Sequence, residues 1–172
     1  MEGEEDVPSI SLHAISGLQG PRTMRVKGWI GPSKVVLLVD SGSTHNFISP
    51  TVASRAGFIP TKERNLDVMV ANREKMTSGG VCRGVFIHLG KVLFQVDFYI
   101  LPIEGCEAVL GAIWLKSLGP ILWDFSRLWM SFIWKGVIVE LKGEYAPCDK
   151  YIKGPKAIKA LCGGLWGMFL QI

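Results

Sequence analysis

The chain has 172 residues, of which 48% are hydrophobic and 20% are charged, and its formal net charge is +4. This is enough apolar material for one domain with its own buried core. The basic residues are scattered along the chain, and four of the first six residues are acidic. The pattern therefore lacks the basic block that is typical of a nucleic-acid-binding arm.

The cysteines and the C-terminal tail argue against a zinc-binding protein and against a membrane-anchored one. Cys82, Cys106, Cys148 and Cys162 form no CxxC or Cys/His spacing that could hold zinc, so we expect free thiols in a reducing, intracellular setting, with no metal and no cofactor. The tail at residues 157–172 is apolar but contains a lysine and three glycines. A membrane span takes about 20 consecutive apolar residues, so we interpret this tail as a linker rather than an anchor.

Taken in chain order, the pattern is one of short strands separated by turn residues. Residues 24–30 and 35–39 form a predicted hairpin around Gly31 and Pro32. Ser49 and Pro50 then predict the start of a short helix that ends at Gly57. Further strands are predicted at residues 66–71, 75–80, 81–90, 92–101, 121–125, 128–134 and 136–143.

A strand, a turn of small residues and a short helix occur twice, about 70 residues apart. In the second copy, Val109 and Leu110 end a strand, Gly111 turns the chain, and residues 112–118 have helical spacing. We expect the backbone geometry of these turns to require Gly42 and Gly111, because a Cβ there would clash or force an unfavourable dihedral angle. The acid at the turn, Asp40, is present only in the first copy.

Asp40 stands directly after five aliphatic residues, 35–39, which predict a strand buried on both faces. A charged carboxylate is costly in such a place unless hydrogen bonds compensate. Ser41 and Ser43 can donate hydroxyl hydrogens, and Gly42 lets backbone amides come close. By themselves these residues leave two interpretations open: a carboxylate that only caps the turn, and a catalytic one.

Four separated segments, residues 39–49, 70–82, 96–125 and 128–143, together resemble the retropepsin-like aspartic protease domain of plant Ty3/gypsy retrotransposon polyproteins. The resemblance implies a mostly β fold, a closed barrel of one lobe with short helices, that pairs as a two-fold symmetric homodimer. Residues 1–9 are predicted to be a disordered acidic lead because they lack apolar periodicity, and residues 144–172 are an expected linker. The resemblance covers residues 10–143, the expected protease domain. It also implies a cytoplasmic or virus-like-particle setting.

The same resemblance implies the site residues. Asp40 falls on the catalytic aspartate, with Ser41, Gly42 and Ser43 in the active-site loop, and Val109, Leu110 and Gly111 match the apolar-apolar-Gly turn. Two departures are DSG in place of the commoner DTG, and Ala112 and Ile113 where many viral members have a polar pair. The substrate-binding flap is expected near residues 70–78, with its tip at Ala71, Asn72, Arg73, Glu74 and Lys75.

The implied function is that of an aspartic endopeptidase that hydrolyses a polypeptide, the polyprotein, with a water activated by two aspartates. Asp67, Asp97 and Asp124 lack a following loop of small residues, so none of them is expected to be the second catalytic aspartate. We expect a homodimer in which each chain supplies its own Asp40. The alternative is a retropepsin-like dimerisation module, decayed or domesticated, with weak or no proteolysis.

Other site classes fit less well. His45 lies five residues after Asp40, which raises the alternatives of a Ser/His hydrolase and of a metal site. The GxSxG motif of such hydrolases is absent, and no second histidine stands at a spacing typical of metal ligands. The six tryptophans are predicted to pack in the core or at the dimer interface rather than on bases, because Arg and Lys do not alternate with them. A nucleic-acid-binding segment of the polyprotein would carry zinc knuckles or a reverse-transcriptase signature, and the sequence has neither, so nucleic acid is not an expected partner. A membrane is not an expected partner either, because the tail is too short and too polar to span one.

Overall fold

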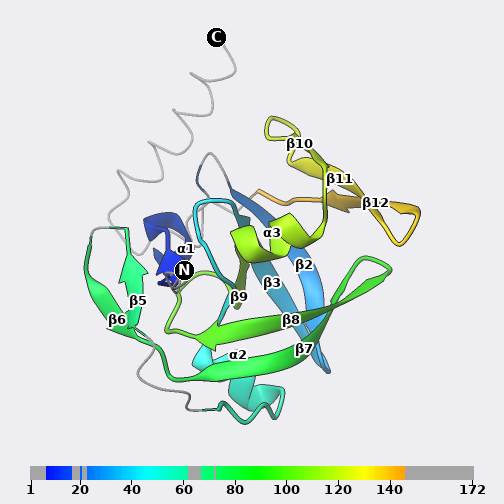
Figure 1. Ribbon diagram of the computed structural model, residues 1–172. Coiled ribbons are helices and arrows are strands. Elements are labelled where there is room, and N and C mark those ends of the chain that lie inside the picture. The colour runs from blue at the N-terminus through cyan, green and yellow to red at the C-terminus, as the bar shows by residue number, and fades with distance from the viewer. Residues whose placement is uncertain (1–6, 17–19, 21–22, 62–66, 72, 146–172) are drawn as a thin grey trace, which may run out of the picture.

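The computed structural model describes residues 7–16, 20, 23–61, 67–71 and 73–145 (Figure 1). In this part of the chain, six strands close a barrel and two three-stranded sheets lie outside it. The prediction of a mostly β, closed-barrel fold with short helices is confirmed. The barrel order is β2 (Thr23–Ile30), β3 (Ser33–Asp40), β9 (Ala108–Leu110), β4 (Phe47–Ile48), β8 (Val92–Ile100) and β7 (Val81–Leu89).

Two smaller sheets and three short helices lie outside the barrel in the described part of the chain. One sheet joins β1 (Ser9–Ile10), β5 (Asp67–Val70) and β6 (Lys75–Thr77), and α1 (Leu12–Ser16) follows β1 directly. The other consists of β10 (Ile121–Asp124), β11 (Trp129–Trp134) and β12 (Val137–Lys142). The remaining helices are α2 (Pro50–Arg55) and α3 (Ala112–Ser117).

The predicted first hairpin is β2 and β3, paired antiparallel around a turn in which Gly31 has a φ of 55°. Beside it, β9 runs parallel to β3, with Leu37 opposite Ala108 and Val39 opposite Leu110. Parallel strands end at the same edge of a sheet. The turns of the two strand-turn-helix copies therefore meet at one end of the barrel, which brings Asp40 close to the Gly111 turn.

The two helices of these copies begin and end near the predicted residues. Ser49 caps α2, because its hydroxyl accepts a hydrogen bond from the Val52 amide at 3.2 Å. Gly57, just beyond α2, has a left-handed φ of 73°, which glycine adopts without steric cost. Gly111 is the N-cap of α3.

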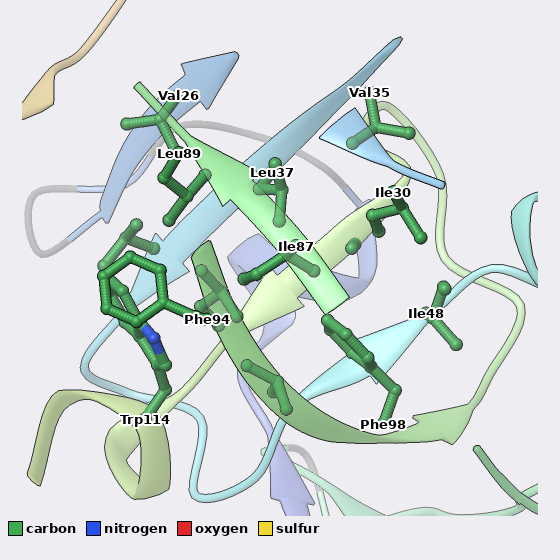
Figure 2. Close-up of a cluster of buried hydrophobic side chains, with 14 of the residues drawn as sticks. Val26, Ile30, Val35, Leu37, Ile48, Ile87, Leu89, Phe94, Phe98 and Trp114 are labelled. Carbon is green, nitrogen blue, oxygen red and sulfur yellow. The ribbon is translucent and has the colours of Figure 1, made fainter. Parts of the chain in front are cut away.

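The main core fills the barrel. Alternate residues of β7, Val85, Ile87 and Leu89, are fully buried and meet inward-facing residues of β2, β3 and β8 (Figure 2). Trp114 on α3 packs edge-on against Phe94 with the ring centroids 5.5 Å apart, so the helix is fixed to the barrel by aromatic contact. Trp114 thus lies in the core, as expected, whereas Trp29 is 47% exposed.

A second, smaller core lies on the other face of β3. While Leu37 and Val39 face the barrel core, Leu38 packs with residues from the N-terminal segment and from β5. This explains the unbroken aliphatic run before Asp40, since β3 is buried on both faces. The second core consists of Ile10, Ala14, Leu38, Phe47, Val68, Val70, Leu101, Ile103, Cys106 and Val109.

The N-terminal segment is more ordered than the sequence predicts. Ser9, expected at the end of a disordered lead, belongs to β1, and neither β1 nor α1 was predicted. Val7 and Pro8 of that lead are also described, whereas residues 1–6 and the part of the linker from residue 146 on lie outside the described residues. Cys82 and Cys106 are buried free thiols. Among the described helices, none has the length and apolar character needed to cross a membrane.

Candidate active site

Asp40 is the last residue of β3 and is only 2% exposed. Three hydrogen bonds hold its carboxylate. The Gly42 amide donates to Oδ1 at 2.9 Å, and the hydroxyls of Ser43 and Ser11 donate to Oδ2 at 2.7 and 2.5 Å. Hydrogen bonds to an ionised acceptor are strong, and together they offset the cost of burying the charge.

Two of the three predicted loop residues therefore contact Asp40. Ser43 is 1% exposed and bonds to the carboxylate, and Gly42 contributes its amide, as the sequence suggested. Ser41 is exposed and, within the described contacts, makes no hydrogen bond to Asp40.

The Gly111 turn and the start of α3 hold the loop that follows Asp40 by hydrogen bonds. The amides of Ala112 and Ile113, at the start of α3, donate to the carbonyls of Ser43 and Thr44 at 2.7 and 3.0 Å. These are helix-terminal N–H groups that have no partner within the helix. The bracing uses backbone rather than side chains, which explains how Ala112 and Ile113 can stand where a polar pair is common. Val109 and Leu110 are fully buried in β9.

Gly111 is required here by close approach and not by its dihedral angles. Its φ of −96° is open to any residue. A Cβ at this position, however, would lie 2.2 Å from the His45 carbonyl oxygen and 2.7 Å from that of Ser43. At Gly42 an added Cβ would meet Asp40 Oδ1 at a tighter but tolerable 3.2 Å. The two glycines thus differ in how strictly they are needed.

Asn46 is a site residue that sequence reasoning missed. It is 4% exposed, its Oδ1 accepts from the Gly111 amide at 2.9 Å, and its Nδ2 donates to the Asp97 carbonyl at 3.2 Å. The side chain therefore connects the Asp40 loop, the Gly111 turn and β8. An asparagine in a polar loop usually indicates a turn, so its sequence context carried no signal for this long-range role.

The predicted flap is an antiparallel hairpin of β5 and β6, with Val68 opposite Met76. At its tip the Val70 amide donates to the Glu74 carbonyl and the Arg73 amide to the Val70 carbonyl, both at 2.8 Å. Arg73 has a left-handed φ of 68°. The structure places Ala71, Arg73, Glu74 and Lys75 at this tip, while Asn72 lies outside the described residues.

Ser11 is the second residue that the sequence did not reveal. It precedes α1, and its hydroxyl accepts from the Ala14 amide at 3.1 Å while it donates to Asp40. Its own amide donates to the Ser43 hydroxyl at 3.1 Å. An N-cap serine can be recognised locally, but its contact with a carboxylate 29 residues away cannot.

The other acids and His45 are engaged elsewhere. Nδ1 of His45 lies 2.8 Å from the Thr44 hydroxyl, and its ring packs edge-on against Tyr99. Asp97 accepts a hydrogen bond from the Gly84 amide. The pKa of the half-buried Asp124 is lowered, chiefly by the hydrogen bond from the Ser126 hydroxyl. The described residues contain no group of three or more His, Cys, Asp or Glu side chains placed to bind a metal ion.

Among the described residues, Cys106 is a buried thiol close enough to Asp40 for the carboxylate to affect its pKa. Burial raises its pKa to about 12, against a smaller lowering by the Arg25 cation, and Glu107 and Asp40 add to the rise. At neutral pH the group is therefore an uncharged thiol. The thiolate is the nucleophilic form of cysteine, so the protonated Cys106 is a poor nucleophile, and its side chain packs in the second core as a small apolar group.

The comparisons with known proteins agree with this geometry. The model of the aspartyl protease family matches residues 23–114, more than half of the chain, which includes Asp40, both turns and the flap hairpin. No curated protein matches the sequence. The retroviral protease-like domain of Ddi1 from Leishmania major is similar in structure, with a TM-score of 0.56 and 14% identity, over 72% of this chain and 94% of that one.

A retropepsin-like aspartic protease from Rickettsia conorii also matches, with a TM-score of 0.44 and 16% identity, over 59% of this chain and 76% of that one. At these identities the likeness to Ddi1 concerns the fold, which is the retropepsin-like barrel. The family follows from the sequence model. This chain belongs to the aspartyl protease family.

Proposed function

We propose that the protein is an aspartic endopeptidase and that Asp40 is its catalytic residue. The observation that carries this proposal is the carboxylate itself, which ends a strand buried on both faces and is held by the Gly42 amide and the Ser43 hydroxyl. A carboxylate fixed in this way can orient a water toward a peptide carbonyl.

The reaction needs a second carboxyl group. In aspartic proteases two aspartates share one proton, as is established for that class, so that one acts as base on the water and the other as acid toward the scissile carbonyl. This chain contains one DSG sequence. A homodimer with a two-fold axis between two Asp40 residues would supply the pair, with Ser41 exposed at the tip of each loop and available to a partner chain.

The substrate in this proposal is an extended polypeptide, and the flap hairpin of β5 and β6 would close over it. The motifs in the sequence further favour a retrotransposon polyprotein as the substrate, processed by the domain that it contains. An extended chain adds readily to an exposed strand edge, which makes backbone pairing with the flap a natural way to hold it.

A second function is favoured by one observation. Asp40 is almost fully buried in the single chain, and the Ser11 hydroxyl already occupies its Oδ2. This state suits the alternative of a dimerisation module with weak or no proteolysis. The two functions differ in whether Asp40 ever meets a substrate.

The deciding experiment compares the wild-type chain with Asp40→Asn on a mixed library of internally quenched decapeptides. Asparagine keeps the shape of the side chain and removes its acid-base function. We expect cleavage by the wild type and at least a thousandfold loss in the variant, since the dyad is then incomplete. Equal rates in both would exclude Asp40, and unchanged thermal unfolding of the variant is the control for folding.

A further inference from the structure

The N-terminal segment at residues 8–11 lies extended between the flap and the Asp40 loop. On one side β1 runs parallel to β5, with Ser9 opposite Met69 and Ile10 opposite Val70, and the Met69 amide donates to the Pro8 carbonyl at 2.8 Å. In Figure 1 α1 lies beside the β5–β6 hairpin. The segment thus completes the sheet of the flap as an added strand.

On its other side the same segment bonds to the loop that follows Asp40. The Ser9 amide donates to the Thr44 hydroxyl at 2.8 Å, and the Thr44 amide donates to the Ser9 carbonyl at 2.9 Å. An extended backbone that is bonded on both edges, by a hairpin and by the catalytic loop, has the arrangement in which a protease holds a peptide.

The segment ends on the catalytic carboxylate. The Ser11 hydroxyl donates a short hydrogen bond of 2.5 Å to Asp40 Oδ2, so it occupies a place on the carboxylate where an attacking water would have to bind. Ile10 and Ala14, 1% and 0% exposed, fill the second core beside Leu38, Val68 and Val70. The pocket of about 530 Å³ next to the loop is lined by His45, Asn46 and Tyr99 but not by Asp40, so it is not the way to the carboxylate.

We propose that residues 8–14, here called the N-terminal plug, occupy the peptide-binding cleft and keep the protease latent. The inference rests on the proposed function, because it takes Asp40 as the catalytic group. A peptide substrate, as an extended chain, competes with the plug for the edge of β5 and for Thr44. The plug also has to leave before a second Asp40 can approach, since one chain alone already buries the first.

This competition has a kinetic signature. If the cleft is open only in a small fraction of molecules, the apparent affinity for substrate is reduced by that fraction. Ser11→Ala removes the hydrogen bond to Asp40 and weakens the closed state, by about tenfold for a bond to a charged group. We therefore expect Ser11→Ala to lower KM for the peptide library by about tenfold relative to a control variant.

Ser16→Ala is the matched control. It is the same serine-to-alanine change at the other end of α1, and the described hydrogen bonds of the Ser16 hydroxyl go to the helix carbonyls of Leu12 and His13 rather than to Asp40. Its KM should equal that of the wild type. An equal KM for Ser11→Ala and Ser16→Ala, in an enzyme that cleaves the library, would overturn the plug.

The accessibility of Asp40 can also be measured by chemical labelling, which does not require the protein to cleave peptides. Carbodiimide coupling of glycine ethyl ester labels accessible carboxyl groups, and mass spectrometry reports each site. In the wild-type chain Asp40 should stay unlabelled while the exposed Asp67 and Asp97 react. The double variant Ile10→Ala/Ser11→Ala should raise labelling of Asp40 at least tenfold, with Asp67 and Asp97 as internal references and the circular dichroism of the barrel retained.

The two readouts separate the two proposals. Labelled Asp40 in a variant that cleaves nothing would leave the plug standing and would count against the proposed function. Asp40 that remains protected in a folded double variant would show that something other than residues 8–14 covers it, and the plug would be refuted whether or not the protein cleaves peptides.

Discussion

Replacement of Gly111 by alanine tests the packing on which the site depends. The added Cβ would lie 2.2 Å from the His45 carbonyl oxygen and 2.7 Å from the Ser43 carbonyl oxygen, and both are backbone atoms that cannot rotate away. The loop must therefore move away from α3. That movement breaks three hydrogen bonds, from the amides of Gly111, Ala112 and Ile113 to Asn46, Ser43 and Thr44.

The expected cost follows from those bonds. Each backbone hydrogen bond contributes about 1 kcal/mol net, so Gly111→Ala should lower the free energy of unfolding by about 3 kcal/mol. For a domain of this size that corresponds to a fall in Tm of about 6–12 °C. Differential scanning calorimetry and urea titration at one pH would both measure it.

Gly119→Ala is the control for backbone strain alone. Gly119 has a left-handed φ of 74°, and a Cβ there would meet nothing within 4 Å. Its replacement should cost about 1 kcal/mol. If Gly111→Ala lowers Tm no more than Gly119→Ala does, the close approach of the loop to α3 is wrong.

Three further predictions follow from the site. Ser43→Ala removes a buried hydroxyl from Asp40 and should lower both kcat and the free energy of unfolding, the latter by about 2 kcal/mol; an unchanged kcat would contradict its bracing role. The pKa of Cys106 is higher in the folded chain, about 12, than its usual value of 9.0, so its contribution to stability is complete below pH 9 and is lost as pH rises toward 12. The free energies of unfolding of the wild type and Cys106→Ala, measured by urea titration, should therefore change differently with pH between 9 and 12. Iodoacetamide at pH 8 should label Cys106 only after unfolding. The shared proton of the Asp40 pair predicts a bell-shaped rate profile with its better side below neutrality, and a rate that still climbs above pH 7.5 would speak against the pair.

Local patterns in the sequence were sufficient for much of the fold. The hairpin of β2 and β3, the helix that starts after Ser49 and the Gly111 turn each depend on residues that are close in sequence: an aliphatic run, a cap, a glycine. The placement of Asp40 at the end of a strand buried on both faces followed from the same run of residues. These features are decided by neighbours along the chain, and the structure has them within one or two residues.

The parts that were missed depend on distant residues. A two-residue strand such as β1 has no periodicity of its own, and it forms because β5, some 60 residues later, offers an edge. Ser11 and Asn46 look like ordinary cap and turn residues, and only the fold brings their side chains to Asp40 and Gly111. The sequence left open whether a Cβ at Gly111 would clash or force an unfavourable dihedral angle, and the structure shows the clash.

The central claim is that catalysis requires two Asp40 carboxylates from two chains, and a subunit-mixing titration tests it most directly. Wild-type chain is held at a concentration where its specific activity no longer rises, and folded Asp40→Asn chain is added with the peptide library in excess. Random pairing with a fourfold excess of variant leaves about one fifth of the wild-type chains in fully wild-type dimers. The account predicts that activity falls to about one fifth. Activity that stays constant as the variant is added would contradict it.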